Sequence, residues 1–215
     1  MASTCYPRRI YLVRHGESVW NAEKRISGQG NPPLSEVGRQ QAAALAQVLC
    51  NVPLTAVYTS TLRRTLETAY PVAANHGLPI QRRADLCEIC LGELQGRYRD
   101  ERDPAAQALW QHWQADKDQM RLPGGETFIE FEQRILCCWE TICGANAGGS
   151  PLIIGHRSTN RVILGAIMGW PHAQAKTLPI RNKYLYEIIP GPQPAIATIR
   201  LDEGKIGHRY AEFRT

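Results

Sequence analysis

The sequence predicts an α/β fold: a three-layer sandwich with a largely parallel central sheet, helices on both faces and a small helical and loop insertion beside the ligand site. Two observations lead to this prediction. Short apolar runs alternate along the chain with longer segments whose apolar residues recur every three or four positions. The composition, 43% hydrophobic and 21% charged over 215 residues, is typical of a globular domain. We therefore expect one domain over residues 1–215, with the insertion at about 92–122.

The first predicted strand and helix lie near the start of the chain. Residues 10–13 (IYLV) are apolar and lead directly into the polar loop RHGES, as expected where a buried strand ends. Ser35 is a suitable N-cap, and the apolar residues after it recur at helical spacing. Asn51 and Pro53 end this predicted helix. The strand and the helix together begin the alternation of strands and helices.

A second strand, a second helix and a third strand follow in order. Residues 56–59 (AVYT) predict a strand, and either Ser60 or Thr61 is expected to cap the helix that runs to about residue 77. Residues 79–82 predict the next strand. This alternation is the pattern of parallel strands joined by crossover helices.

The segment from residue 86 to residue 125 interrupts the alternation. It contains Gly92, Gly96 and a Trp-rich helix predicted over residues 104–119. Trp110 and Trp113 in that helix are expected to form a packing face. We interpret the segment as an insertion that walls the ligand site.

The remaining elements are a long helix, a strand, a short helix and a C-terminal hairpin. The apolar repeat after the turn PGGE predicts the long helix, and residues 152–154 (LII) predict a buried strand that ends in a polar loop. The predicted ranges are 128–142 for the long helix, 152–154 for the strand, 161–169 for the short helix, and 184–189 and 195–201 for the hairpin.

The charge of the chain indicates small anionic ligands. With 25 Lys+Arg against 20 Asp+Glu the net charge is +5, and the arginines are concentrated in the N-terminal half. A nucleic-acid binder would need a denser basic stripe with interleaved aromatic residues, so we expect no nucleic-acid partner. The longest apolar run, residues 162–170, is less than half of the roughly 20 residues that span a bilayer, so we expect no membrane partner.

The seven cysteines indicate a reducing compartment. Their odd number, their irregular spacing and the polar start of the chain argue against a secreted disulfide framework, so we expect a cytoplasmic protein. Cys87 and Cys90 have CxxC spacing, but no second pair accompanies them. We interpret them as two reduced thiols and expect no metal site.

Two predicted strands end in loops that contain histidine, His15 in one and His156 in the other. Ligands of open α/β sheets bind at the carboxyl ends of the strands. If the two strands are neighbours, both imidazole rings lie over one crevice, although they are far apart in the sequence.

Several motifs together resemble the histidine phosphatase (phosphoglycerate mutase-like) superfamily. They occur in the family's order and span residues 10–161, which makes the resemblance far more specific than a single RHG tripeptide. The motifs are LVRHGES at 12–18, STLRRTLETA at 60–69, LCE at 86–88, GELQG at 92–96, PGGE at 123–126 and IGH at 154–156.

The resemblance implies a role for each matching residue. His15 matches the nucleophile, and Glu88 matches the group that protonates the leaving oxygen and later activates water, a role that requires a protonated carboxyl group when substrate binds. Of the adjacent pair at 63 and 64, the alignment favours Arg64 as the phosphate ligand, with Arg63 facing solvent. The implied phosphate pocket consists of Arg14, Arg64 and His156, with Asn21, Ser27 and Gly28 as further phosphate or substrate contacts.

These residue types also fit phosphoryl transfer on chemical grounds. A neutral imidazole can attack phosphorus and form a phosphohistidine, which divides the reaction into two steps. Neighbouring arginines keep the imidazole neutral, because like charge disfavours imidazolium, and they bind phosphate oxygens through paired donors. We therefore expect arginines, without a metal ion or a cofactor, to neutralise the phosphate charge.

Three positions depart from the family pattern. Arg157 follows His156 where glycine is usual, and we hypothesise that it binds a second anionic group of the substrate, such as a carboxylate. Asn31 stands where an acidic residue is common, and Glu67 stands where glutamine is common; both positions are expected to be peripheral.

The predicted function is hydrolysis of a small phosphomonoester, with phosphoserine favoured and sugar phosphates or phosphoglycerate-type esters, as well as α-ribazole phosphate, as alternatives. The cofactor-dependent mutases carry a longer insertion with further basic residues, whereas only 37 residues separate Glu88 from Glu126. A mutase is the alternative activity, and a phosphate-binding module without catalysis is the alternative of another class. The expected partner is the small-molecule substrate, and because the family often dimerises, a homodimer is left open.

Overall fold

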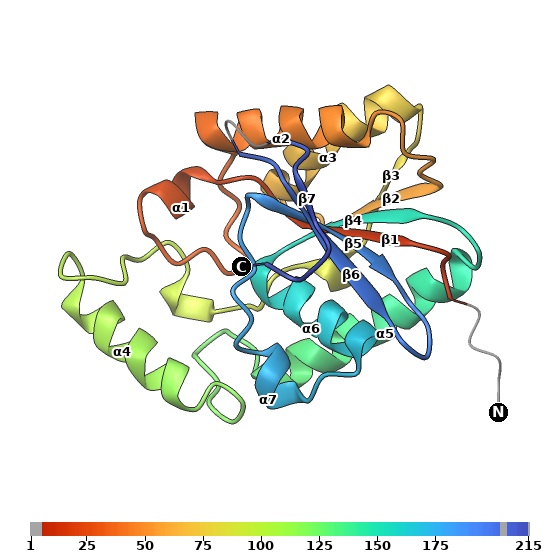
Figure 1. The fold of residues 1–215 in the computed structure, drawn as a ribbon. Coiled ribbons are helices and arrows are strands. Elements are labelled where there is room, and N and C mark those ends of the chain that lie inside the picture. The colour runs from red at the N-terminus through yellow and green to blue at the C-terminus, as the bar shows by residue number, and fades with distance from the viewer. Residues whose placement is uncertain (1–5, 203–205, 215) are drawn as a thin grey trace.

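A single seven-stranded sheet forms the centre of the protein in a computed structural model that describes residues 6–202 and 206–214. Its strand order is β3-β2-β4-β1-β5-β6-β7 (Figure 1). The strands are β1 (Ile10–Arg14), β2 (Ala56–Thr59), β3 (Ile80–Arg82), β4 (Pro151–Gly155), β5 (Tyr184–Ile189), β6 (Ala195–Arg200) and β7 (Arg209–Tyr210).

The sheet has a parallel half and an antiparallel half. β3, β2, β4 and β1 pair in parallel, and β5, β6 and β7 extend the sheet in antiparallel fashion. In the β1–β4 pair, Arg14 lies opposite Gly155, so the carboxyl ends of these two strands are level. The residues that follow them, His15 and His156, therefore emerge at the same edge of the sheet.

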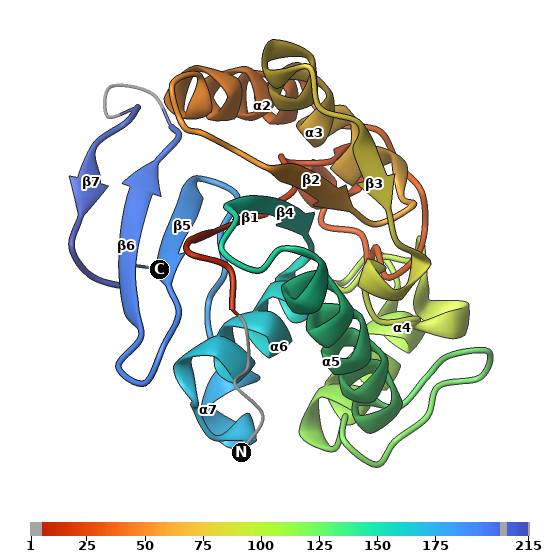
Figure 2. The same cartoon turned by 90° about the vertical axis from the view of Figure 1, so that its right-hand side faces the viewer.

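Helices cover both faces of the sheet. α2 (Glu36–Leu49) and α3 (Arg63–His76) lie on one face, and α5 (Phe128–Ala145), α6 (Arg157–Met168) and α7 (His172–Ala175) lie on the other, as Figure 2 shows. The alternation of strand side chains fills both cores. In β1, Tyr11 and Val13 pack in the core under α2 and α3, whereas Ile10 and Leu12 pack with the α5 and α6 residues.

The predicted fold class is confirmed, and the differences concern the ends of elements and some short elements. α6 begins at Arg157 and not at residue 161, because the polar residues after β4 already form its first turn. The inserted helix α4 (Pro104–Ala115) ends four residues earlier than predicted. The short helix α1 (Val19–Ala22) and the strand β7 were not predicted from the sequence, since neither is long enough to show an apolar period.

The start of α3 also differs from the prediction. Its N-cap is Leu62, which offers no side-chain oxygen, so neither Ser60 nor Thr61 caps the helix. Instead Asn31, from a distant loop, accepts the N–H of Arg63 at 2.6 Å. The first turn of α3 is therefore tied to the loop that follows α1, and this tie places the helix against the ligand site.

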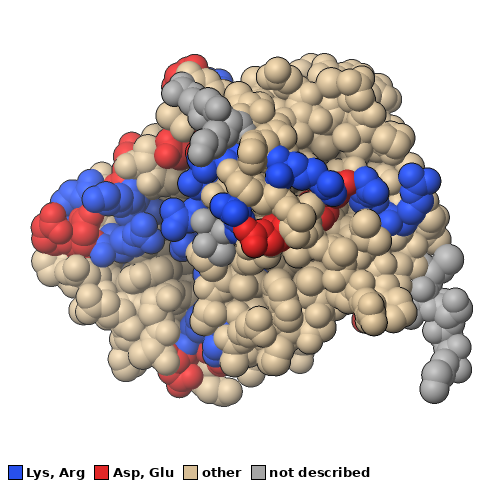
Figure 3. Space-filling view, viewed as in Figure 1, with Lys and Arg blue, Asp and Glu red and all other residues tan. Residues whose placement is uncertain are grey.

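The inserted segment packs against the α5 side of the core. It comprises the 3₁₀ turn η2 (Gly92–Leu94) and the helix α4, and Ala106 and Trp113 of α4 are buried; the 3₁₀ turn η1 (Ala84–Leu86) precedes it. Lys and Arg side chains gather on the side of the molecule that carries α1 and the chain leading to α4 (Figure 3). Among the described residues, no helix is long and apolar enough to cross a bilayer.

Candidate active site

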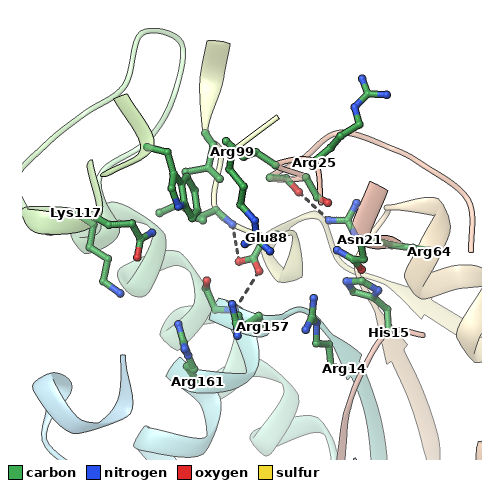
Figure 4. Close-up of a pocket in the computed structure, with 18 of the residues that line it drawn as sticks. Arg14, His15, Asn21, Arg25, Arg64, Glu88, Arg99, Lys117, Arg157 and Arg161 are labelled. Carbon is green, nitrogen blue, oxygen red and sulfur yellow. Dashed lines mark hydrogen bonds between the residues drawn. The ribbon is translucent and has the colours of Figure 1, made fainter. Parts of the chain in front are cut away.

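A cavity of about 410 Å³ opens at the carboxyl ends of β1 and β4, with α4 and the chain after it on the opposite wall (Figure 4). Eight of the nine predicted site residues line this cavity: Arg14, His15, Asn21, Ser27, Gly28, Arg64, Glu88 and Arg157. The ninth, His156, does not line it. His156 is fully buried, and its ring centroid lies 5.1 Å from that of His15.

The ring of His15 is fixed by the backbone that follows it. Its Nδ1 lies 2.7 Å from the carbonyl oxygen of Gly16, and since a carbonyl can only accept, Nδ1 must carry the proton. The lone pair is therefore on Nε2. Asn182 donates to the His15 carbonyl at 2.6 Å, and the Gly16 N–H donates to Thr68 at 2.9 Å, so the loop is held from two sides.

His15 is neutral because of its surroundings. Burial lowers its pKa well below the ordinary histidine value, and the positive charges of Arg64 and Arg14 lower it further. The residue is 3% exposed. A neutral imidazole with a free Nε2 lone pair is the form that can act as a nucleophile.

Arg64 is the most buried cation of the site, with 1% of its surface exposed. Its guanidinium donates to the carbonyl oxygens of Gly30 and Gly28, at 2.5 and 2.8 Å, and to His156. Burial lowers its pKa to about 10. Its neighbour Arg63 points to solvent and pairs with Glu67, so the structure separates the two adjacent arginines.

Arg14 lies on the other side of His15. Its guanidinium donates to the carbonyl of Ile180 at 3.3 Å, and its buried Nε has no partner among the described residues. Burial first, and then the charge of Arg157, lowers its pKa to about 10. The buried hydroxyl of Ser27, on the same cavity, also has no partner in the described part of the chain. Unpaired polar groups at one cavity are typical of a site that binds a polar ligand.

His156 belongs to an ordered hydrogen-bond chain behind the cavity wall. Arg64 donates from Nε to Nδ1 of His156 at 3.3 Å, so the ring proton must be on Nε2, 2.9 Å from the Ser60 hydroxyl. Ser60 also accepts the Leu62 N–H at 3.1 Å and lies 2.8 Å from the hydroxyl of Thr65. Burial and the charge of Arg64 lower the pKa of His156 well below its ordinary value. The ring therefore contacts the cavity residues Arg64 and His15 from behind the wall.

Asn21 and Gly28 shape the cavity beside Arg64. Asn21 is in α1, where its Oδ1 accepts the Ser18 N–H at 3.2 Å. This bond uses the oxygen of the side-chain amide and not its NH₂ group. Gly28 has a φ of +45°, and a Cβ there would lie 2.5 Å from the side-chain oxygen of Gln95. The positive φ favours glycine, since the Gln95 side chain could move aside, and the Gly28 carbonyl in this conformation reaches Arg64.

Glu88 is held at the first turn of α6. Its two carboxylate oxygens accept the N–H groups of Ile89 at 2.9 Å and Ser158 at 3.1 Å (Figure 4). Arg134 of α5 donates to the backbone carbonyls of Cys87 and Glu88 at 2.9 and 3.3 Å, which fixes the loop that carries the carboxyl group.

Several residues at the site were missed by the sequence analysis. Asn182 and Arg134 act through backbone carbonyls of distant segments, and no local pattern indicates such contacts. Glu126 was quoted only as part of PGGE; its carboxylate accepts the Cys90 N–H at 2.7 Å and pairs with Arg134. The remaining missed residues are four cations of the cavity wall: Arg25, Arg99, Lys117 and Arg161.

Arg157, the residue that departs from the family pattern, opens α6 and lines the cavity. Its guanidinium forms no hydrogen bond or ion pair with the residues that the structure describes. Burial lowers its pKa, and the charge of Arg99 lowers it further. The helix accommodates the arginine side chain at its first position.

A neutral histidine between two arginines, at the carboxyl end of a parallel sheet, defines a site for phosphoryl transfer. The family comparison agrees, because the model of the histidine phosphatase superfamily (branch 1) matches residues 10–196. The chain belongs to this superfamily of phosphoryl-transfer enzymes.

The chain is similar both to a mutase and to phosphatases. A probable phosphoglycerate mutase from Yersinia pestis is 32% identical over 190 residues, which is 88% of each chain. A mycobacterial glucosyl-3-phosphoglycerate phosphatase has a TM-score of 0.70 and 26% identity, over 84% of this chain and 92% of its own. The alpha-ribazole phosphatase of Shigella flexneri shares the fold, with a TM-score of 0.79 and 23% identity over 96% of this chain and all of its own.

Proposed function

We propose that the protein is a phosphatase that hydrolyses a small phosphomonoester through a phosphohistidine at His15. One observation carries the proposal: His15 is a neutral imidazole whose Nδ1–H is committed to the Gly16 carbonyl and whose Nε2 lone pair is free beside Arg14 and Arg64. This is the state that attack on phosphorus requires.

The reaction has two steps. Nε2 of His15 attacks phosphorus, the P–O bond to the alcohol breaks, and the alcohol oxygen takes a proton from Glu88. Water then attacks the phosphohistidine, gives its proton to the Glu88 carboxylate, and the P–N bond breaks to release phosphate and restore the nucleophile. Two contacts support Glu88 in this role. Two backbone N–H groups hold its carboxyl group in the cavity wall, and Arg134 holds its backbone carbonyl.

The phosphate oxygens are bound by Arg14 and Arg64, with Asn21, Ser27 and the backbone at Gly28 around them. When phosphate binds, Arg64 gives up part of its hydrogen bonding to the backbone carbonyls and donates to the phosphate instead. His156 keeps the Nε of Arg64 in place. The two guanidinium groups supply the positive charge that the transition state requires, so the reaction proceeds without a metal ion or a cofactor.

The proposed substrate is a metabolite such as phosphoserine, with sugar phosphates and phosphoglycerate-type esters as the competing candidates. Arg157 favours an ester with a second anionic group, because its guanidinium faces the cavity without a partner among the described residues. The cavity wall is largely polar, which supports hydrolysis because water must reach the phosphohistidine. The alternative activity is phosphoglycerate mutase, which the name of the Yersinia relative favours.

The test is phosphate release from a panel of phosphomonoesters in the presence of EDTA, with wild type and His15→Ala compared. We expect activity in EDTA that falls by at least about 10³-fold in His15→Ala. Activity that requires added metal, or an alanine variant with wild-type activity, would contradict the mechanism. No hydrolysis of any ester, with phosphate still bound, would favour the binding module.

A separate assay distinguishes hydrolysis from mutase activity. The interconversion of 3- and 2-phosphoglycerate is measured with 2,3-bisphosphoglycerate present, alongside phosphate release from the same ester. We expect phosphate release to be the faster reaction. Interconversion faster than release would identify a mutase.

A further inference from the structure

The cavity carries more positive charge than one phosphate needs. Seven Lys and Arg side chains line it, against the two carboxylates of Glu17 and Glu88. Five of the seven donate to backbone carbonyls, which carry no net charge: Arg14, Arg25, Arg64, Lys117 and Arg161. A bound phosphate dianion beside His15 would balance only part of the remaining charge, so the surplus needs a second explanation.

Two of the surplus cations stand on one helix. Arg157 and Arg161 are four residues apart in α6, so both side chains lie on the same face, which is the face that lines the cavity. Burial lowers the pKa of Arg161 to about 10, and the charge of Arg157 contributes to the shift. A like-charged pair at this spacing destabilises a helix. Arg161 donates to the carbonyl of Leu178, but neither guanidinium has a carboxylate at ion-pair distance among the described residues.

A third cation faces this pair from the inserted segment. Lys117, which follows α4, donates its ammonium group to the carbonyl of Lys176 at 3.3 Å, and burial and the charge of Arg161 lower its pKa. In Figure 4 the side chains of Lys117, Arg161 and Arg157 follow one another toward Arg14 and His15. The charges lead away from the nucleophile into the outer part of the cavity.

We propose that Arg157, Arg161 and Lys117 form a second anion subsite, and that the substrate is a phosphomonoester whose alcohol portion carries a second anionic group, a carboxylate or a phosphate. The subsite rests on the proposed function, because it places the second group relative to a phosphate on His15. Two guanidinium groups can each bind an oxyanion through paired donors, and the ammonium group adds a third charge. Its cations come from α6 and from the end of the insertion, and one of them stands where the family usually has glycine.

Substrates matched in all but the second anion test the subsite. Phosphoserine and phosphoethanolamine differ by one carboxylate, and propane-1,3-diol bisphosphate and propane-1,3-diol monophosphate differ by one phosphate. The measurement is the ratio of kcat/KM between the members of each pair, for wild type, Arg161→Gln, Lys117→Gln and Arg157→Gln. Arg121→Gln is the matched control, because Arg121 is an exposed arginine of the same segment that pairs with Glu130 and does not line the cavity.

We expect wild type to prefer the charged member of at least one pair by about 10-fold or more, and each of the three variants to reduce that ratio by about 10-fold, as the loss of a charge-assisted hydrogen bond predicts. The pair that shows the preference identifies the second group as carboxylate or phosphate. Arg121→Gln is expected to keep the wild-type ratio.

Two results would overturn the subsite: a wild-type ratio near one for both pairs, or a ratio that the three variants leave unchanged. Failure of the proposed function gives a different result. In that case the hydrolysis of p-nitrophenyl phosphate, whose alcohol portion carries no second anion, would not depend on His15 at all.

Discussion

The two ends of the cavity are built in opposite ways. At the inner end, His15, Arg64 and His156 are buried, and every ring nitrogen or guanidinium is fixed by backbone or side-chain partners except the free Nε2 of His15. At the outer end, Arg157 and Arg161 stand side by side on one helix face, and neither forms an ion pair with a described residue, although the charge of Glu88 reaches both. The inner end is prepared for one chemical step, whereas the outer end is unfavourable until an anion binds. The comparison indicates that reactivity and substrate choice are carried by separate parts of the site.

The largest expected effect separates the adjacent arginines of α3. Arg64→Ala removes a phosphate ligand and leaves the buried carbonyls of Gly28 and Gly30 unpaired, so kcat/KM should fall by about 10³-fold, from charge-assisted hydrogen bonds of roughly 1.5–3 kcal/mol each. Arg63→Ala removes only an exposed pair with Glu67 and should cost about 0.5 kcal/mol of stability. Steady-state kinetics and chemical denaturation measure both. Equal losses of activity in the two variants would contradict the assignment of Arg64.

Acid should destabilise the inner end. The pKa values of His15 and His156 are lowered well below the ordinary value of about 6.5 by burial and by arginine charge. Below pH 6.5 the unfolded chain binds protons that the folded protein does not, so the free energy of unfolding falls as the pH falls. Each ring contributes up to about 1.4 kcal/mol per pH unit. Denaturant unfolding between pH 7 and pH 5 measures the slope.

Two histidine variants serve as the comparison for this slope. His15→Asn should reduce it, because one of the two depressed groups is removed. His112→Asn, at an exposed position on α4, should not change it. A wild-type slope in His15→Asn would show that the buried rings do not control the pH dependence.

A smaller effect is expected from the hydrogen-bond chain behind His156. Ser60→Ala removes the acceptor of the Nε2 proton, so the ring can turn and Arg64 loses its fixed partner. We expect kcat to fall by about 10-fold, the cost of one unsatisfied buried group of roughly 1–3 kcal/mol. Thr65→Ser keeps the hydroxyl group that contacts the Ser60 hydroxyl, so this variant should retain wild-type kcat. If Ser60→Ala raised KM and left kcat unchanged, the hydrogen bonds from Ser60 through His156 would not position Arg64 for the reaction.

The smallest effect has the opposite sign. Arg157→Gln relieves the like-charged pair with Arg161 and removes no hydrogen bond among the described residues, so it should raise the free energy of unfolding by about 0.2–0.5 kcal/mol in low salt. The gain should shrink as salt screens the pair. Thermal unfolding at two ionic strengths measures it, and a destabilised variant at both would show that Arg157 supports the fold.

The two ends also differ in how far the sequence predicts them. The buried strand at residues 10–13, the histidine after it and the choice of Arg64 over Arg63 follow from local apolar runs and from motifs, because backbone geometry near a strand end is a local property. The first turn of α6 was predicted as loop, because the polar residues from 156 to 160 show no apolar period.

The contacts that the sequence could not indicate are long-range. Asn31 caps α3 from a loop that precedes it by about 30 residues, and Asn182 holds the His15 carbonyl from the other end of the chain. Lys117 and Arg161 carry no motif, and only the folded chain brings them to one cavity wall. The roles of the site residues, the single domain, the cytoplasmic location and the question of a homodimer stay predictions.

Trapping the phosphorylated enzyme tests the proposed chemistry at its core. In Glu88→Gln with p-nitrophenyl phosphate, the leaving group departs without a proton, but the water step lacks its base, so the intermediate should accumulate. We expect a burst of p-nitrophenol that matches the enzyme concentration and, after rapid quenching in base, a phosphoryl group on His15 by peptide mass spectrometry. A phosphoryl group on another residue, or a burst without phosphorylated His15, would contradict the mechanism.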